Sequence, residues 1–428
     1  MNILFKKARV IDPENKVDQI LDVLVINGKI ASLSPNIINN NVRNIDCKDK
    51  ILAPGFIDTH THLNCSIQSL EDNIESETQA AVAGGFTTIS CMPDVKPSID
   101  NPNSFIILNN LIKRYSRTNV FIIGALTIKM LGKELAYLDG LYNEGVIAFS
   151  DDRPIKDSMM LRNAFRYVGQ YQVPIFLNCE DCFLTENGVV NEGFIQIITG
   201  LNSRPSIAEA IMVYRDVLLA LEEKAKVNIL NITCSKSIEA IKYFKLKNSN
   251  IFTSITPYYF SLTDDWCINF NTNAKFQPPL RDKNDLNSLK EGIKEGLIDV
   301  IASGHEPCTI DEKNVVFNQA RSGATSLELV LTLLLSEIVF PKVLDFSEAI
   351  SKLTINPAKL LGINKGTLGI GKEADIVVFD PQMEWLITQD TLHSKGKNTP
   401  LLNKKVKGKV IYTIVGGDIK YSYEKSIK

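Results

Sequence analysis

Two histidines, His60 and His62, stand two residues apart at the end of an apolar run in the segment PGFIDTHTHLN, residues 54–64. In an extended strand this spacing turns both side chains to the same face, so the two imidazoles could bind one metal ion. A His-x-His pair alone is a weak signal, because ordinary surface and core histidines show it as well. The metal hypothesis therefore depends on further ligands at the ends of other strands.

From residue 56 onward, short apolar and β-branched runs alternate with segments of helical period. Eight such runs over about 250 residues predict an α/β fold, a (β/α)8 barrel whose active site lies where the strands end. The predicted strands are residues 56–60, 86–90, 120–124, 146–150, 174–178, 227–232, 251–255 and 298–303.

The two ends of the chain differ from this pattern. Residues 1–53 and 366–428 are rich in strand-like runs with glycine turns, and they predict a small β-sandwich formed by both termini. Residues 54–365 then form the barrel domain.

Segment 207–223 predicts an amphipathic helix. Its apolar residues fall on one helical stripe, and a capping-box pattern precedes them. The stripe consists of Ile207, Ile211, Tyr214, Leu218 and Leu221, and the capping pair is Ser206 with Glu209.

Composition excludes several classes of protein. Of the 428 residues, 44% are hydrophobic and 22% charged, and the net charge of −2 predicts neither a nucleic-acid nor an anionic-membrane partner. No apolar run reaches transmembrane length and the N-terminus lacks a signal-peptide pattern, so we expect a soluble, cytoplasmic protein. The eight cysteines are scattered, and the pair Cys179 and Cys182 has no second pair with which to form a zinc knuckle. We expect reduced thiols.

The residues that follow several predicted strands stand where a barrel would place its chemistry. They are Asp94, Asp151, Asp152, Asn178, Asn231, Gly304, His305 and Glu306, together with the two histidines already named.

Several motifs resemble those of the dihydroorotases, specifically the long bacterial class within the amidohydrolase superfamily: PGFIDTHTHL, AAVAGGFTTISCMPDVKPSIDN, GVIAFSDD, NCED, QPPLRD, HEP and LTINPAKLLGI. The resemblance covers nearly the whole chain. It implies a (β/α)8 barrel with a terminal β-sandwich, a metal site, and the closure of carbamoyl-aspartate to dihydroorotate in pyrimidine synthesis.

The resemblance also shows what this chain lacks. His60 and His62 match the pair that binds the buried metal, and we assign Asp151 as the matching carboxylate ligand. The family's two further histidines are replaced by Asn178 and Asn231, whose neutral amide oxygens are poor zinc ligands. We therefore expect zinc at one weak site at most.

Gly304 stands where the family has an aspartate that binds metal and serves as general base. A glycine cannot accept the proton of an attacking water, a contribution worth about 10²–10⁴-fold in rate. Asp152 and His305 remain as substitutes for this task, as do Glu180 and Asp181, although His305 should point the other way along a strand.

The predicted substrate pocket differs as well. Asn64 stands in place of the family's carboxylate-binding arginine. Asp94 replaces the asparagine of the MPNT motif, and Gln277 replaces an asparagine before the two prolines. Exchanging a guanidinium for an amide and adding a carboxylate disfavours a dianionic substrate. Two family histidines are replaced by Tyr258 and Tyr259.

Two hypotheses from different classes follow, and we favour the first. The chain is a catalytically inactive dihydroorotase homologue that serves as a structural partner of aspartate carbamoyltransferase, as some members of the family do. Alternatively it is an active enzyme, a dihydroorotase or related cyclic amidohydrolase with a mononuclear site. A pocket adapted to another small ligand, with Asp94 and the tyrosines as contacts, is a third interpretation. A homo-oligomer is expected from base rates.

Overall fold

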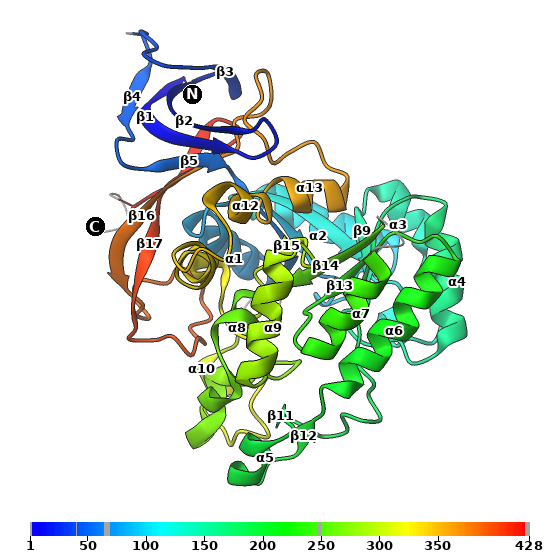
Figure 1. The fold of residues 1–428 in the computed structure, drawn as a ribbon. Coiled ribbons are helices and arrows are strands. Elements are labelled where there is room, and N and C mark those ends of the chain that lie inside the picture. Colours follow the sequence, from blue (N-terminus) through cyan, green and yellow to red (C-terminus); the bar gives the residue numbers. More distant parts are fainter. Residues whose placement is uncertain (1, 40, 64–68, 246–249, 424–428) are drawn as a thin grey trace.

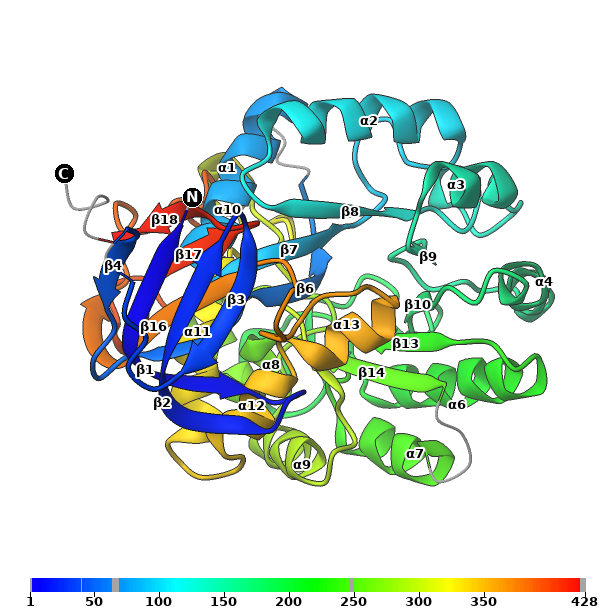
Figure 2. The same ribbon diagram turned by 90° about the horizontal axis from the view of Figure 1, so that it is seen from above.

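The computed structural model describes residues 2–39, 41–63, 69–245 and 250–423. Eight parallel strands form its central sheet, in the order β6-β7-β8-β9-β10-β13-β14-β15, and helices lie outside them (Figures 1 and 2). All eight predicted strands are present, which confirms the (β/α)8 fold. They are β6 (Phe56–Thr61), β7 (Phe86–Cys91), β8 (Asn119–Gly124), β9 (Ala148–Ser150), β10 (Ile175–Asn178), β13 (Val227–Leu230), β14 (Ile251–Ile255) and β15 (Val300–Ile301).

The first and last strands of the barrel approach one another just beyond β15. The backbone N–H of His62 donates to the carbonyl of His305 at 2.9 Å, and Thr61 forms a parallel bridge with His305. Asp58 accepts a hydrogen bond from the backbone N–H of Ser303 at 2.6 Å. The His-x-His segment therefore lies beside residues 303–305.

The helices that follow the strands cover the outside of the barrel, and shorter helices occupy the loops. The main ones are α1 (Leu70–Ala83), α2 (Pro102–Tyr115), α3 (Leu138–Glu144), α4 (Ser158–Gly169), α6 (Ile207–Glu222), α7 (Ser235–Lys245), α9 (Lys283–Lys294), α11 (Val330–Leu334), α12 (Phe346–Ser351) and α13 (Ile355–Leu361). Short elements at the loops are α5 (Phe194–Thr199), α8 (Pro257–Ser261), α10 (Ile310–Lys313), β11 (Val190–Asn191) and β12 (Ser203–Arg204).

Helix α6 is present, but its orientation differs from the simplest interpretation of its sequence. The predicted apolar stripe faces outward: Ile211 is 46% exposed and Leu218 is 55% exposed. The buried face carries smaller side chains, among them Val213 and Val217. The capping-box prediction is wrong, because Ser206 makes no side-chain cap bond and Glu209 is buried instead.

Both termini contribute to one further sheet of eight strands, in the order β18-β17-β16-β5-β1-β2-β3, with β4 paired to β1. Its apolar side chains form a core cluster separate from the main core of the barrel. The strands are β1 (Ile3–Asp12), β2 (Val17–Ile26), β3 (Lys29–Ser34), β4 (Arg43–Asp46), β5 (Ile51–Pro54), β16 (Ile376–Leu386), β17 (Lys405–Val415) and β18 (Asp418–Ser422).

The terminal sheet also shares a core with the barrel. Phe56 of β6 packs edge-on against Phe86 of β7, with 5.8 Å between ring centroids, and its ring is tilted against Phe379 of β16 at 6.2 Å. Trp385 and Val410 of the terminal sheet belong to the same cluster. Among the described residues, no helix is both long enough and apolar enough to cross a membrane.

Candidate metal centre and pocket

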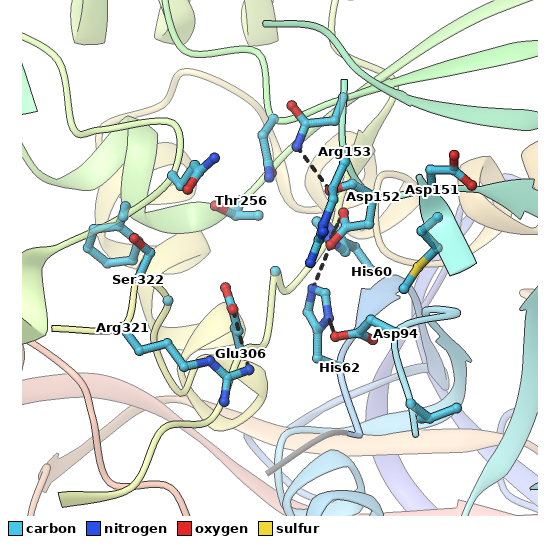
Figure 3. A pocket seen from close by; sticks show the side chains of 18 of the residues that line it. His60, His62, Asp94, Asp151, Asp152, Arg153, Thr256, Glu306, Arg321 and Ser322 are labelled. Atoms are coloured by element: carbon cyan, nitrogen blue, oxygen red, sulfur yellow. Dashed lines mark hydrogen bonds and ion pairs between the residues drawn. The ribbon is translucent and has the colours of Figure 1, made fainter. Parts of the chain in front are cut away.

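A cavity of about 560 Å³ lies at the carboxyl ends of the barrel strands, where the sequence placed the chemistry. Residues at or after the ends of all eight strands line it, and most of them are polar. They include His60, His62, Asp94, Lys96, Asp151, Asp152, Arg153, Asn178, Asn231, Thr256, Tyr259, Gln277, Gly304, Glu306, Arg321 and Ser322 (Figure 3).

Three side chains converge at one side of this cavity. Asp152 lies between the two histidines: one carboxylate oxygen is 3.3 Å from His60 Nε2 and the other is 3.5 Å from His62 Nε2. One ligand atom from each residue lies within 4.8 Å of the others, and this is the only such group found in the described part of the chain. Two imidazoles and a carboxylate are a typical donor set for zinc with one coordination position left open.

The carboxylate of this cluster is Asp152, which corrects the assignment of Asp151. Asp151 is turned to the loop after β8, where it accepts hydrogen bonds from the backbone N–H groups of Leu126 and Thr127 at 2.9 and 2.8 Å. The Thr127 hydroxyl donates a further bond to it. Asp152 has a φ of +49°, and the change in backbone direction between the two neighbours separates their side chains.

His62 is held by a second carboxylate. Its Nδ1 lies 2.9 Å from Asp94 Oδ2 (Figure 3). Burial lowers the pKa of His62, but the negative charges of Asp94 and Asp152 outweigh burial and raise that pKa to about 10. A metal ion that binds at Nε2 must displace a proton from this ring, so metal binding should release protons.

His60 supports the interpretation that these residues fit a metal. Both ring nitrogens are buried, and neither makes a hydrogen bond among the described residues. Buried polar atoms in native structures nearly always have a partner, so an unsatisfied imidazole beside a carboxylate indicates a ligand for something absent from the protein atoms. The residues present therefore fit one divalent cation.

The resemblance implies further metal ligands at positions 178, 231 and 304, where this chain has two amides and a glycine. Asn178 and Asn231 line the cavity with amides, and Asn178 Nδ2 makes a 3.5 Å contact with the backbone carbonyl of Asp152. Gly304 lines the cavity without a side chain. It has a φ of +59°, and a Cβ added there would lie 2.2 Å from Thr256 Cγ2. A side chain at 304 would therefore require Thr256 to shift.

His305 does not enter the cavity, so it cannot replace the missing base. It is fully buried, its Nε2 lies 2.7 Å from Glu77 of helix α1, and its Nδ1 accepts from the backbone N–H of Ser326 at 3.1 Å. Glu180 and Asp181 are also absent from the cavity lining. Glu180 is paired with Arg204.

Glu306, which the sequence placed at the end of the eighth strand without a role, faces the cavity opposite His62 (Figure 3). Its position just after a strand was the available signal. Arg321, another cavity residue, lies 3.6 Å from Glu306. Burial raises the pKa of Glu306, and the positive charges of His62 and Arg321 oppose this.

The remaining predicted pocket residues differ in their positions relative to the cavity. Gln277 lines the cavity, and Asn64 lies outside the described residues. The hydroxyl of Tyr258 donates to the carbonyl of Thr325 at 2.7 Å, and that of Tyr259 donates to the carbonyl of Pro278 at 2.8 Å. Both tyrosine hydroxyls are therefore already bonded to backbone carbonyls. This weakens the hypothesis that the pocket uses them to contact another small ligand.

The chain is similar to characterised proteins over its full length. A model of the amidohydrolase family matches residues 51–420. A dihydroorotase of Trichlorobacter lovleyi is 39% identical over 99% of this chain and 100% of that protein. A dihydroorotase of Acetivibrio thermocellus is 38% identical over 97% of this chain and 98% of that protein.

Solved structures share the fold at lower identity. The L-hydantoinase (dihydropyrimidinase) of Arthrobacter aurescens superposes with a TM-score of 0.87 at 22% identity, covering 98% of this chain and 95% of that one. The dihydropyrimidinase of Brevibacillus agri superposes with a TM-score of 0.84 at 22% identity, with the same coverage.

Proposed function

The chain belongs to the amidohydrolase family and is a full-length relative of dihydroorotases. Despite this relationship, we propose that it does not interconvert carbamoyl-aspartate and dihydroorotate. The observation that carries the proposal is Gly304. The position that the resemblance assigns to the general base has no side chain, so no carboxylate there can accept a proton from an attacking water.

Two further differences support the same conclusion. Amides at Asn178 and Asn231 stand where the family has imidazoles, so the cavity offers nitrogen ligands on one side only. Asp94 adds a carboxylate to a cavity that would have to accept a dianionic substrate. Metal binding, proton transfer and substrate binding are each impaired relative to the family.

The test is an assay of the purified full-length chain in both directions, with zinc added, beside the Trichlorobacter lovleyi dihydroorotase as a positive control. We expect no turnover above the protein-free reaction. A rate within the usual enzyme range of about 1–10³ s⁻¹ would disprove the proposal.

We further propose that the chain is retained as a structural partner of aspartate carbamoyltransferase. The support is the resemblance, together with a complete barrel and terminal sheet around a reduced site. Sedimentation velocity of the two purified proteins, alone and mixed at micromolar concentration, tests this. A new, faster-sedimenting species is expected, and unchanged profiles in the mixture would argue against a scaffold role.

A second candidate function is a one-metal hydrolase acting on a different cyclic amide. It is favoured by the convergence of His60, His62 and Asp152 and by the Glu306 carboxylate that faces them. A bound zinc ion would polarise a substrate carbonyl group. Glu306, with its raised pKa, could carry a proton to or from the substrate.

Hydantoin and dihydrouracil are suitable first substrates, because the solved proteins with the same fold are named for hydantoins and dihydropyrimidines. Zinc-dependent hydrolysis that falls about 10²–10⁴-fold in Glu306→Gln would establish this candidate. Equal rates for Glu306→Gln and the unmodified protein would exclude Glu306 as the proton carrier.

A further inference from the structure

We propose that Asp94 is a positioning residue for the cation centre: it fixes the orientation of His62 and thereby raises the affinity of the centre for a divalent cation. The resemblance assigns this position to an asparagine of the substrate pocket. In this chain a carboxylate stands there, and it is directed at a histidine.

The first step of the argument is the geometry of the hydrogen bond. Asp94 follows strand β7, and its Oδ2 lies 2.9 Å from His62 Nδ1 (Figure 3). An ionised carboxylate can only accept, so Nδ1 carries the hydrogen. The metal-binding nitrogen is then Nε2, which lies 3.5 Å from the Asp152 carboxylate. The Asp94 bond therefore selects the tautomer that directs a lone pair into the cluster.

The second step is the contrast with His60. His60 Nε2 lies 3.3 Å from the Asp152 carboxylate, but neither ring nitrogen of His60 makes a hydrogen bond in the described part of the chain, so no hydrogen bond at Nδ1 holds its ring. Of the two imidazoles, His62 is thus the one oriented by a carboxylate in advance. Carboxylates that accept from a metal-binding histidine change metal affinity by about 10–100-fold.

The third step concerns charge. Two neutral imidazoles and the Asp152 carboxylate leave one positive charge of a divalent cation unbalanced. Gly304 contributes no carboxylate to the cavity. Asp94, hydrogen-bonded to His62, supplies a second negative charge next to the centre, whereas the Glu306 carboxylate lies across the cavity beside Arg321. The aspartate at 94 thus compensates electrostatically for the aspartate missing at 304.

The experiment measures zinc affinity of the metal-stripped full-length protein by competition with a chromophoric chelator. The variants are Asp94→Asn, which keeps a hydrogen-bond acceptor but loses the charge, and Asp94→Ala, which loses both. The visible spectrum of the cobalt(II)-loaded protein gives an independent signature of the coordination geometry. Glu306→Gln is the matched control, because it removes a cavity carboxylate whose ion-pair partner is Arg321.

We expect the zinc affinity to fall about 10–100-fold in Asp94→Asn, and at least as far in Asp94→Ala. Glu306→Gln should change it by a factor of about 3 at most, the size of a charge effect without a hydrogen bond to a ligand. The cobalt spectrum should change in the Asp94 variants and stay unchanged in Glu306→Gln.

Two results would overturn the proposal. One is an unchanged affinity in Asp94→Asn while thermal unfolding in chelator shows the variant to be folded. The other is an equal loss in Asp94→Asn and Glu306→Gln, which would assign the effect to net charge alone. Because the readout is metal affinity, the outcome is independent of whether the protein converts dihydroorotate.

Discussion

Asp151 and Asp152 are adjacent in the chain but serve different purposes. The carboxylate of Asp151 satisfies backbone N–H groups of the β8 loop, and that of Asp152 lies between the two histidines. We predict that Asp152→Asn lowers zinc affinity by more than about 100-fold, because it removes a group that would bind the metal itself. A carboxylate that only hydrogen-bonds to a metal-binding histidine has a smaller effect.

The neighbouring substitution, Asp151→Asn, is the control. It should leave zinc affinity close to that of the unmodified protein and lower the free energy of unfolding by about 1–3 kcal/mol, because it weakens buried hydrogen bonds to the backbone. Chelator competition and urea denaturation measure the two effects. The opposite pattern would restore Asp151 as the ligand.

The buried pair of Glu77 and His305 should make stability depend on pH. Burial tends to raise the pKa of Glu77, but the hydrogen bond from His305 and those from serine hydroxyls lower that pKa below its ordinary 4.5. The unfolded chain therefore binds a proton more readily than the folded chain does. The contribution of Glu77 is complete above its unfolded pKa and is lost as pH falls toward the folded one.

We predict that Glu77→Gln lowers the free energy of unfolding by about 1.5–3 kcal/mol at pH 7, the value of a hydrogen bond to a charged group. The difference from the unmodified protein should narrow at pH 3.5, as measured by urea denaturation at both pH values. Glu75→Gln on the same helix, which alters an exposed pair with Arg117, should have an effect within about 0.5 kcal/mol. A difference of equal size at both pH values would contradict the assignment.

At the scale of elements, the strands could be predicted from the sequence and the orientation of helix α6 could not. Parallel strands covered on both sides are near-continuous apolar runs, as in the buried IFL of β10, so their positions were clear. In α6, the exposed Ile211 and Leu218 are larger than Val213 and Val217, which face the barrel. The smaller side chains are buried because they fit against the barrel. A stripe of large apolar residues does not identify the buried face when the contact requires small ones.

The two faces of α6 give a direct test. Met212→Ala, at a position 5% exposed, should cost about 2–5 kcal/mol of unfolding free energy, because it leaves a cavity against the barrel. The adjacent Ile211→Ala removes atoms that are already half exposed and should cost within about 0.5 kcal/mol. Similar losses for the two variants, measured by chemical denaturation, would mean that the outward stripe is covered in solution.

The limits of sequence prediction at the site have a similar cause. His60, His62 and the residues at 178, 231 and 304 could be located because each occupies a recognisable strand end. Asp151 was predicted as the ligand in place of Asp152, and Glu306 was given no role, since the backbone direction in the loops determines which side chain enters the cavity. One turn of the chain, with φ of +49° at Asp152, decides between the two carboxylates.

At the scale of the whole molecule, the terminal sheet and the barrel should unfold together. Phe379, Trp385 and Val410 of the terminal sheet belong to the main core cluster, and Phe379 packs on Phe56 of the first barrel strand. We predict one calorimetric transition for the full chain, with equal calorimetric and van't Hoff enthalpies.

Residues 54–365 expressed alone should lack a cooperative transition, because the strands that cover Phe56 are missing. Circular dichroism during heating would show this. A sharp transition in the shortened chain, or two separate transitions in the full one, would mean that the predicted domain boundary also separates two independent folding units.

The backbone at Gly304 has a consequence for any redesign of the cavity. An aspartate introduced there would bring its Cβ to 2.2 Å from Thr256 Cγ2, so Thr256 would have to shift to admit it. Placing a carboxylate at this strand end by design would therefore take two coordinated substitutions, Gly304→Asp together with a smaller side chain at 256, where a comparison of sequences alone would suggest one.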